Sequence, residues 1–175
     1  MVSSATAYTA LILLVGLERL AELVVSNRNL RWSRGRGGVE IGAGHYPAMV
    51  TLHSALLVGC LAEVWLLDRP FVPALGWPML VLVLASQALR WWCVRTLGPQ
   101  WNTRVVVVPG AGRVRSGPYR FLAHPNYVAV VLEGLALPLV HTAWLTAVLF
   151  SVLNAALLSV RIRTESGALA MLGRA

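Results

Sequence analysis

The chain has 175 residues, of which 57% are hydrophobic and only 13% are charged. Soluble domains carry about 25% charged residues, so this chain has too few polar side chains to cover a surface in water. All 15 basic residues are arginines, and the formal net charge is +8. They lie at the ends of apolar runs, which argues against a nucleic-acid binder and favours contact with anionic lipid headgroups. We therefore expect a single membrane domain over residues 1–175.

Five apolar segments are candidates for membrane-spanning helices, which need about 20 mostly apolar residues. They cover residues 5–25, 46–67, 75–97, 127–140 and 143–160. The fourth segment is short and ends near Pro138, so it is either tilted or partly interfacial. Only His141 and Thr142 separate it from the fifth segment, which predicts a tight antiparallel hairpin. The fold class we predict is an all-α membrane protein of about five transmembrane helices.

The positions of the arginines predict the orientation of these helices. The arginine-bearing connections hold Arg28, Arg31, Arg34 and Arg36, then Arg104, Arg113, Arg115 and Arg120, and finally Arg161 and Arg163. The other connections hold only Arg69, beside Asp68. By the positive-inside rule, the N-terminus lies outside and the C-terminus in the cytoplasm.

Residues 98–120, between the third and fourth segments, are not membrane-like. The β-branched run at residues 105–108 is followed by Pro109 and Gly110, which is typical of a strand and a turn. We expect a short strand and turn, in the form of a small hairpin, at the cytoplasmic surface. An insert of this length usually has a function or is disordered.

Ionisable residues inside apolar segments are costly in a bilayer and are functional candidates unless they are paired. This set comprises Glu18, Arg19, Glu22, Glu63, Arg90 and Glu133. For the first segment and Arg90, structural pairing or snorkelling is the main alternative, and for Glu63 we expect snorkelling to the outer interface. The two cysteines, Cys60 and Cys93, have no histidine at metal-ligand spacing, so we predict core residues and no metal site.

The run with the most chemical information is residues 116–127, with Glu133 six residues further on. It contains a Gly117-Pro118 turn and a His124-Pro125 pair, and Pro125 is suited to the first turn of a helix. Arg161 and Glu165 follow where the fifth segment ends. These groups would place cationic, hydrogen-bonding and carboxylate side chains on one side of the membrane, either as a small-molecule site or as an interfacial belt of Arg and Tyr.

The pattern of residues 117–120, residues 124–127 and residues 161–165 resembles the isoprenylcysteine carboxyl methyltransferase family. The family pattern commonly has an arginine where this chain has Ala123, and a second glutamate where it has Ser166. In the N-terminal half, residues 18–23, 26–29, 36–40 and 45–46 resemble the bacterial branch found beside type III polyketide synthases. The resemblance implies an integral enzyme of the bacterial cytoplasmic membrane that uses S-adenosylmethionine.

The resemblance also implies roles for individual residues. The cofactor-binding part would be residues 98–175, with cofactor contacts from Gly117, Pro118, Tyr119, His124, Pro125, Tyr127, Arg161 and Glu165. Arg161 would anchor the cofactor carboxylate in bidentate fashion. Glu133 and His124 are the candidate catalytic bases, because an enolic or phenolic acceptor benefits from one. Glu18, Glu22 and Arg120 are candidate substrate contacts.

The expected reaction is methyl transfer to an oxygen of a lipophilic acceptor, a long-chain alkylpyrone or alkylresorcinol. The alternatives are methylation of a prenylcysteine carboxylate or a phospholipid amine, and a non-enzymatic transporter or assembly factor. Five spans without a repeat argue against a typical transporter. A polyketide synthase is an expected partner, and the loop at residues 27–44 is either a lid or docking surface or a headgroup-facing loop.

Overall fold

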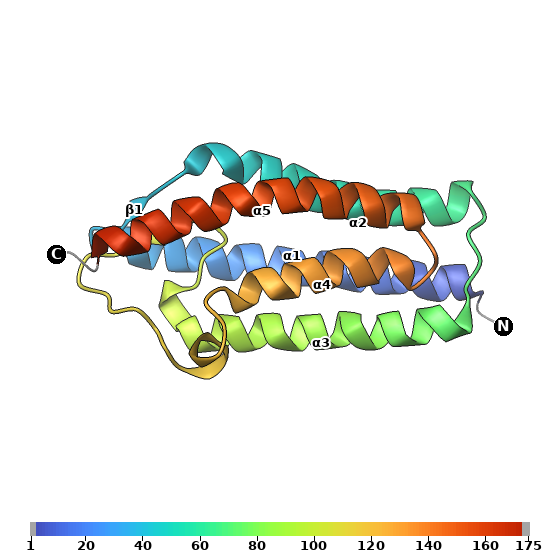
Figure 1. Cartoon of the computed structure of the whole chain (residues 1–175), viewed down its shortest axis with the longest axis horizontal. Coiled ribbons are helices and arrows are strands. Elements are labelled where there is room, and N and C mark those ends of the chain that lie inside the picture. The colour runs from blue at the N-terminus through green and yellow to red at the C-terminus, as the bar shows by residue number, and fades with distance from the viewer. Residues whose placement is uncertain (1–2, 173–175) are drawn as a thin grey trace.

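Five α-helices form an elongated bundle in the computed structural model, which describes residues 3–172 (Figure 1). The helices are α1 (Ser4–Arg34), α2 (Tyr46–Leu66), α3 (Pro73–Leu97), α4 (Pro125–Leu139) and α5 (Trp144–Leu172). Short elements lie between them, namely β1 (Val39–Glu40), β2 (Val106–Val107) and the 3-10 helices η1 (Ala43–His45), η2 (Gly98–Gln100) and η3 (Gly117–Arg120). The mostly helical fold class agrees with the prediction.

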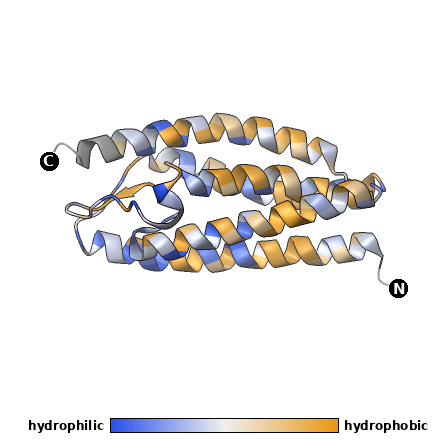
Figure 2. Cartoon of the chain, turned by 60° about the horizontal axis from the view of Figure 1, so that its bottom comes forward, coloured by the Kyte–Doolittle hydropathy of each residue, from blue (hydrophilic) through white to orange (hydrophobic). Residues whose placement is uncertain are grey.

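The surface of the bundle is apolar where a lipid bilayer would surround it. Leu13, Leu14, Leu17 and Leu20 of α1 are all more than half exposed. Figure 2 shows apolar residues along most of the helices and polar residues gathered at the end that carries β1 and β2. Exposed apolar area on this scale marks a membrane protein rather than a soluble one.

Three helical stretches among the described residues are long and apolar enough to cross a membrane. They are Ala43–Leu66, Pro73–Gln100 and Trp144–Ala168, and Pro125–Leu139 is a shorter apolar helix. α1 is longer than any of them, but it carries Glu18, Arg19 and Glu22 near its middle. The predicted count of five spans and the predicted orientation remain predictions.

Helix α1 ends nine residues later than the predicted residue 25. Ser26, Asn29 and Ser33 are buried on this extension. The Asn29 amide donates to the carbonyl oxygens of Gly98 (3.1 Å) and Trp101 (2.7 Å), at the start of the segment between α3 and α4. The polar residues after residue 25 were expected in a solvated loop. They instead form a packed face of α1, which continues to Arg34.

The predicted small hairpin within residues 98–120 is wrong in its pairing. A strand does form at β2, but it pairs antiparallel with β1, with Val39 opposite Val107 and Glu40 opposite Val106. The Arg104 guanidinium extends the contact, because it donates to Glu40 at 2.7 Å and lies 4.0 Å above the centre of the Tyr46 ring. The loop after α1 is thus tied to the segment after α3.

The opposite end of the bundle is fixed by Glu63 of α2, which does not snorkel outward. The Glu63 carboxylate accepts from the backbone N–H groups of Leu145 (3.1 Å) and Thr146 (2.7 Å), in the first turn of α5. It also pairs with Arg69 at 2.9 Å. A carboxylate at a helix N-terminus satisfies unpaired donors and complements the helix dipole, so Glu63 holds the α4–α5 hairpin against α2.

Candidate functional site

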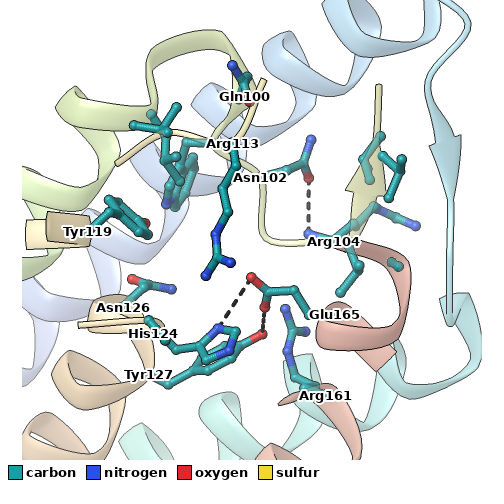
Figure 3. Close-up of a pocket in the computed structure, with 18 residues that line it drawn as sticks. Gln100, Asn102, Arg104, Arg113, Tyr119, His124, Asn126, Tyr127, Arg161 and Glu165 are labelled. Atoms are coloured by element: carbon teal, nitrogen blue, oxygen red, sulfur yellow. Dashed lines mark hydrogen bonds and ion pairs between the residues drawn. The ribbon is translucent and has the colours of Figure 1, made fainter. Parts of the chain in front are cut away.

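A polar cavity lies at the end of the bundle that carries β1 and β2. Its lining comes from the segment between α3 and α4 and from the facing ends of α4 and α5 (Figure 3). The polar lining residues are Gln100, Asn102, Arg104, Arg113, Tyr119, His124, Asn126, Tyr127, Arg161 and Glu165. All lining residues fall between Leu97 and Ala168, which is close to the predicted cofactor-binding part.

His124, Tyr127 and Glu165 form one connected group in this cavity. The His124 and Tyr127 rings stack with centroids 5.4 Å apart and planes at 21°. The Tyr127 hydroxyl donates to one Glu165 oxygen, and His124 Nδ1 lies 3.5 Å from the other. The carboxylate of α5 is therefore held in place by two side chains from the start of α4.

The local sequence explains how these residues meet. Pro125 occupies the first turn of α4, where a missing N–H costs nothing, and this leaves His124 at the N-cap. Gly117 adopts a φ of +53°, and an added Cβ there would lie 2.5 Å from Thr96 Oγ1. Only glycine fits this turn. Gly117, Pro118 and Pro125 thus shape the cavity without lining it.

Tyr119 lies on η3 between this turn and the cavity. Burial of its ring raises the pKa of the Tyr119 hydroxyl far above its ordinary value. The phenol therefore stays neutral throughout the physiological range and offers a hydrogen bond rather than a charge.

Arg161 lies between this cavity and a second one. Its Nη2 donates to the Thr103 carbonyl oxygen at 2.9 Å, and its Nη1 lies 2.8 Å from the Met49 sulfur. Each terminal nitrogen keeps a further N–H beyond these contacts, so the bidentate anchor for a carboxylate remains a prediction. Arg113 also points into the first cavity (Figure 3) and makes no ion pair with any residue between 3 and 172.

The second cavity lies among the helices, deeper in the bundle. Its lining includes Leu23 of α1, Val50 and Leu57 of α2, and Leu157 and Leu158 of α5. Its polar lining residues are Arg19, Glu22, His53, Ser54, Arg90, Trp101, Asn102, Thr103, Asn126, Tyr127, Asn154 and Arg161. Val50, which lines the cavity, is 38% exposed, and Ser54 beside it is also exposed, so the cavity is open along α2 rather than sealed inside the bundle.

The two cavities share part of their lining. The residues common to both are Trp101, Asn102, Asn126, Tyr127 and Arg161. Trp101 Nε1 and Asn126 Oδ1 are buried and have no hydrogen-bond partner among the described residues. Buried polar groups are nearly always paired in folded proteins, and a ligand group at the shared wall would supply the missing partners.

Glu133, a predicted catalytic base, lines neither cavity. Its Oε2 accepts from Arg90 at 2.5 Å and from Arg19 at 3.1 Å. Glu22 pairs with Arg19 at 2.7 Å and lies 3.5 Å from Arg90. Two guanidinium groups stabilise the ionised carboxylate, so Glu133 is a poor proton acceptor and fits the alternative of structural pairing.

The remaining predicted site residues separate into distinct places. His124, Tyr119, Tyr127, Arg161 and Glu165 line the first cavity. Glu22 lines the second, whereas Glu18 lines neither and accepts from the Trp91 indole. Arg120 lies with Arg113, Arg115 and Tyr119 around a shallow surface hollow. Among the described residues, no group of histidine, cysteine and acidic side chains could hold a metal ion.

Sequence reasoning assigned no site role to several cavity residues, among them His53, Trp101, Arg113, Asn126 and Asn154. His53 and Asn154 lie singly inside apolar segments, and a polar residue in such a segment was the available signal. Asn126 lay within the run of residues 116–127 without a role assigned to it.

The fold and its two adjoining cavities define a mostly helical membrane protein with room for a small molecule between the polar end of the bundle and its interior. Residues 79–171 match the model of the isoprenylcysteine carboxyl methyltransferase (ICMT) family. The chain belongs to this family, whose members use S-adenosylmethionine as methyl donor.

A relative covers nearly the whole chain. The chain is 41% identical over 160 residues to the uncharacterized protein YpbQ of Bacillus subtilis (strain 168). The match covers 91% of this chain and 94% of the relative. The similarity thus extends through the N-terminal half, which the family model does not cover.

Proposed function

We propose that this protein transfers a methyl group from S-adenosylmethionine to an oxygen of a lipophilic acceptor, a long-chain alkylpyrone or alkylresorcinol. The observation that carries the proposal is the pair of adjoining cavities, one polar and one open along α2, with five lining residues in common. A charged donor and a lipid-like acceptor would meet at that shared wall.

The residues of the first cavity fit the methyl donor. S-adenosylmethionine carries a carboxylate, an ammonium, a sulfonium, ribose hydroxyls and an adenine ring. Arg113 offers a guanidinium to the carboxylate, and Glu165 offers an anion to the cationic or hydroxyl-bearing part. Tyr119 and Asn126 add neutral hydrogen-bonding groups. The chemistry that the donor supplies when bound is an electrophilic methyl group on a positively charged sulfur.

The protein's own contribution is chiefly positional. Methyl transfer requires the acceptor oxygen to lie in line with the methyl carbon and the sulfur, at short distance and without competing water. The aromatic and amide side chains of the shared wall, Trp101, Tyr127 and Asn126, would hold the two reactants in that arrangement. The acyl tail would lie along Leu57 and Leu157 of the second cavity.

Localisation and partners follow from the same proposal. The arginine-bearing connections favour a bacterial cytoplasmic membrane with the first cavity facing the cytoplasm, where S-adenosylmethionine is made. The exposed arginines Arg28, Arg31 and Arg36 near the end of α1 would face lipid headgroups or a polyketide synthase.

Binding of S-adenosylmethionine to the detergent-purified protein, measured by calorimetry, tests the proposal. We expect binding in the wild type and at least tenfold weaker binding in Glu165→Gln and His124→Ala. Ser166→Ala, at an exposed neighbouring position, is the matched control and should bind like the wild type. A folded wild-type protein that does not bind S-adenosylmethionine would refute the methyltransferase function.

The acceptor is tested separately, with radiolabelled methyl donor. We expect transfer to alkylresorcinols or alkylpyrones, and no comparable transfer to a prenylcysteine or to phosphatidylethanolamine. Methylation of the prenylcysteine alone would replace the proposed acceptor with the carboxylate alternative.

A further inference from the structure

His53 of α2 is a titratable residue that lines the second cavity and that the ion-pair cluster does not use. Its ring packs edge-on against Phe150 of α5, with centroids 5.4 Å apart and planes at 88°. Nδ1 lies 2.9 Å from the Met49 carbonyl oxygen. A carbonyl only accepts hydrogen bonds, so Nδ1 must carry the proton. The neutral imidazole then has its lone pair on Nε2.

Nε2 has no hydrogen-bond partner within residues 3–172. The hydrogen bond to the Met49 carbonyl therefore fixes the tautomer of His53. Nε2 is left as a proton-accepting nitrogen in this cavity, and none of these residues donates a hydrogen bond to it.

Asn154 of α5 supplies a second and independent observation. It is 2% exposed, it lines the same cavity, and its Oδ1 has no partner in the described part of the chain. Asn154 lies one helical turn after Phe150, the residue on which His53 packs, and both His53 and Asn154 line this cavity. A buried amide oxygen without a partner is destabilising, and a bound ligand group would satisfy it.

The unpaired atoms of the cavity indicate the acceptor class. Arg19 and Arg90, which line it, pair with Glu22 and Glu133. Arg161, the other cation of the lining, donates to the Thr103 carbonyl oxygen. Unpaired acceptor atoms on His53 and Asn154 favour a neutral group that donates a hydrogen bond.

From these observations we infer that His53 Nε2 and Asn154 Oδ1 each accept from a hydroxyl group of the acceptor, and that His53 Nε2 takes the proton of the hydroxyl that is methylated. The inference rests on the proposed function and assigns its acceptor as a phenol or enol. The hydroxyl oxygen forms a bond to the methyl carbon, the carbon–sulfur bond breaks, and its electron pair stays on sulfur. The proton of the hydroxyl passes to Nε2, and the imidazolium later releases it to water.

Binding tests the recognition step without turnover. The probes are pentadecylresorcinol and its dimethyl ether, which has the same chain but no donor, added to protein loaded with S-adenosylhomocysteine. We expect the wild type to bind the diphenol about tenfold more tightly than the ether, as one or two buried hydrogen bonds would give. His53→Leu and Asn154→Leu should each remove most of that preference. Thr51→Ala, at an exposed position that lines neither cavity, should keep it.

Rates test the proton transfer. His53→Gln retains an acceptor atom but is not a base, so we expect KM for pentadecylresorcinol to change little and kcat to fall about a hundredfold or more. S-adenosylmethionine binding by each variant is measured in parallel, which shows that the variant is folded.

The outcomes separate the inference from the function on which it rests. If the wild type does not bind S-adenosylmethionine, the proposed function fails. If it does bind, but shows no preference for the diphenol over the ether, the inference is overturned. Wild-type kcat in His53→Gln would likewise overturn the role of His53 as a base.

Discussion

At the scale of single residues, Glu133 of α4 is held by the guanidinium groups of Arg19 and Arg90. A lone carboxylate in an apolar segment next to a His-Pro motif suggested a catalytic base. Its role depends on Arg19 of α1 and Arg90 of α3, which are 114 and 43 residues away in sequence. The sequence around Glu133 contains no sign of partners so far along the chain. Glu133 therefore belongs to the structure of the bundle rather than to the proposed chemistry.

Replacement of Glu133 should affect stability first. A buried ion pair that loses one partner leaves the other charge uncompensated, which costs about 3–5 kcal/mol. We expect Glu133→Leu to lower the melting temperature strongly, and Glu133→Leu combined with Arg90→Met to lower it less than the sum of the two single changes. Thermal unfolding in detergent measures both. Additive effects would show that the two residues do not interact.

At the scale of helices and strands, the starts were easier to predict than the ends. Prolines in the first turns place the starts of α2, α3 and α4 at or within two residues of the predicted positions. The ends of α1 and α5 lie beyond the apolar segments, because their polar faces contact residues 98–103 and the start of α4. A hydropathy pattern contains no information about such contacts.

The contact of Glu63 with α5 leads to a prediction at this scale. Glu63→Ala removes the acceptor for two backbone N–H groups and a favourable charge at the helix N-terminus, so it should destabilise the protein by roughly 1–2 kcal/mol. Asp68→Asn is the matched control, since Asp68 is exposed at the same end and asparagine tolerates its φ of 47°. A thermal shift in the control as large as that in Glu63→Ala would contradict this role.

At the scale of the whole molecule, the β1–β2 pairing joins the N-terminal half to the polar cavity. The sequence indicated a cofactor-binding C-terminal part and a separate arginine-rich loop. The pairing could not be predicted from it, because two-residue strands have no detectable periodicity and their partners are 68 residues apart at Val39 and Val107. The motif residues His124, Tyr127 and Glu165 do meet in one place, as their pattern suggested.

Glu40 provides the test of this connection, because it lines neither cavity but holds Arg104, which lines the first. That hydrogen bond also raises the pKa of the Arg104 guanidinium. We expect Glu40→Ala to weaken S-adenosylmethionine binding roughly two- to fivefold, the range of a partly exposed ion pair. Arg34→Ala, which removes only an exposed contact of 3.8 Å to Glu40, should have no effect. Unchanged affinity in Glu40→Ala would mean that the loop does not support the cavity.

The wall shared by the two cavities has a kinetic consequence. A reactant that reaches it from the flank of the bundle arrives by two-dimensional diffusion within the bilayer, whereas its partner arrives from bulk water. The turnover rate should then depend on the mole fraction of acceptor among the lipids and not on its concentration per volume of solution. Added inert phospholipid would slow the reaction by surface dilution, and added buffer would not.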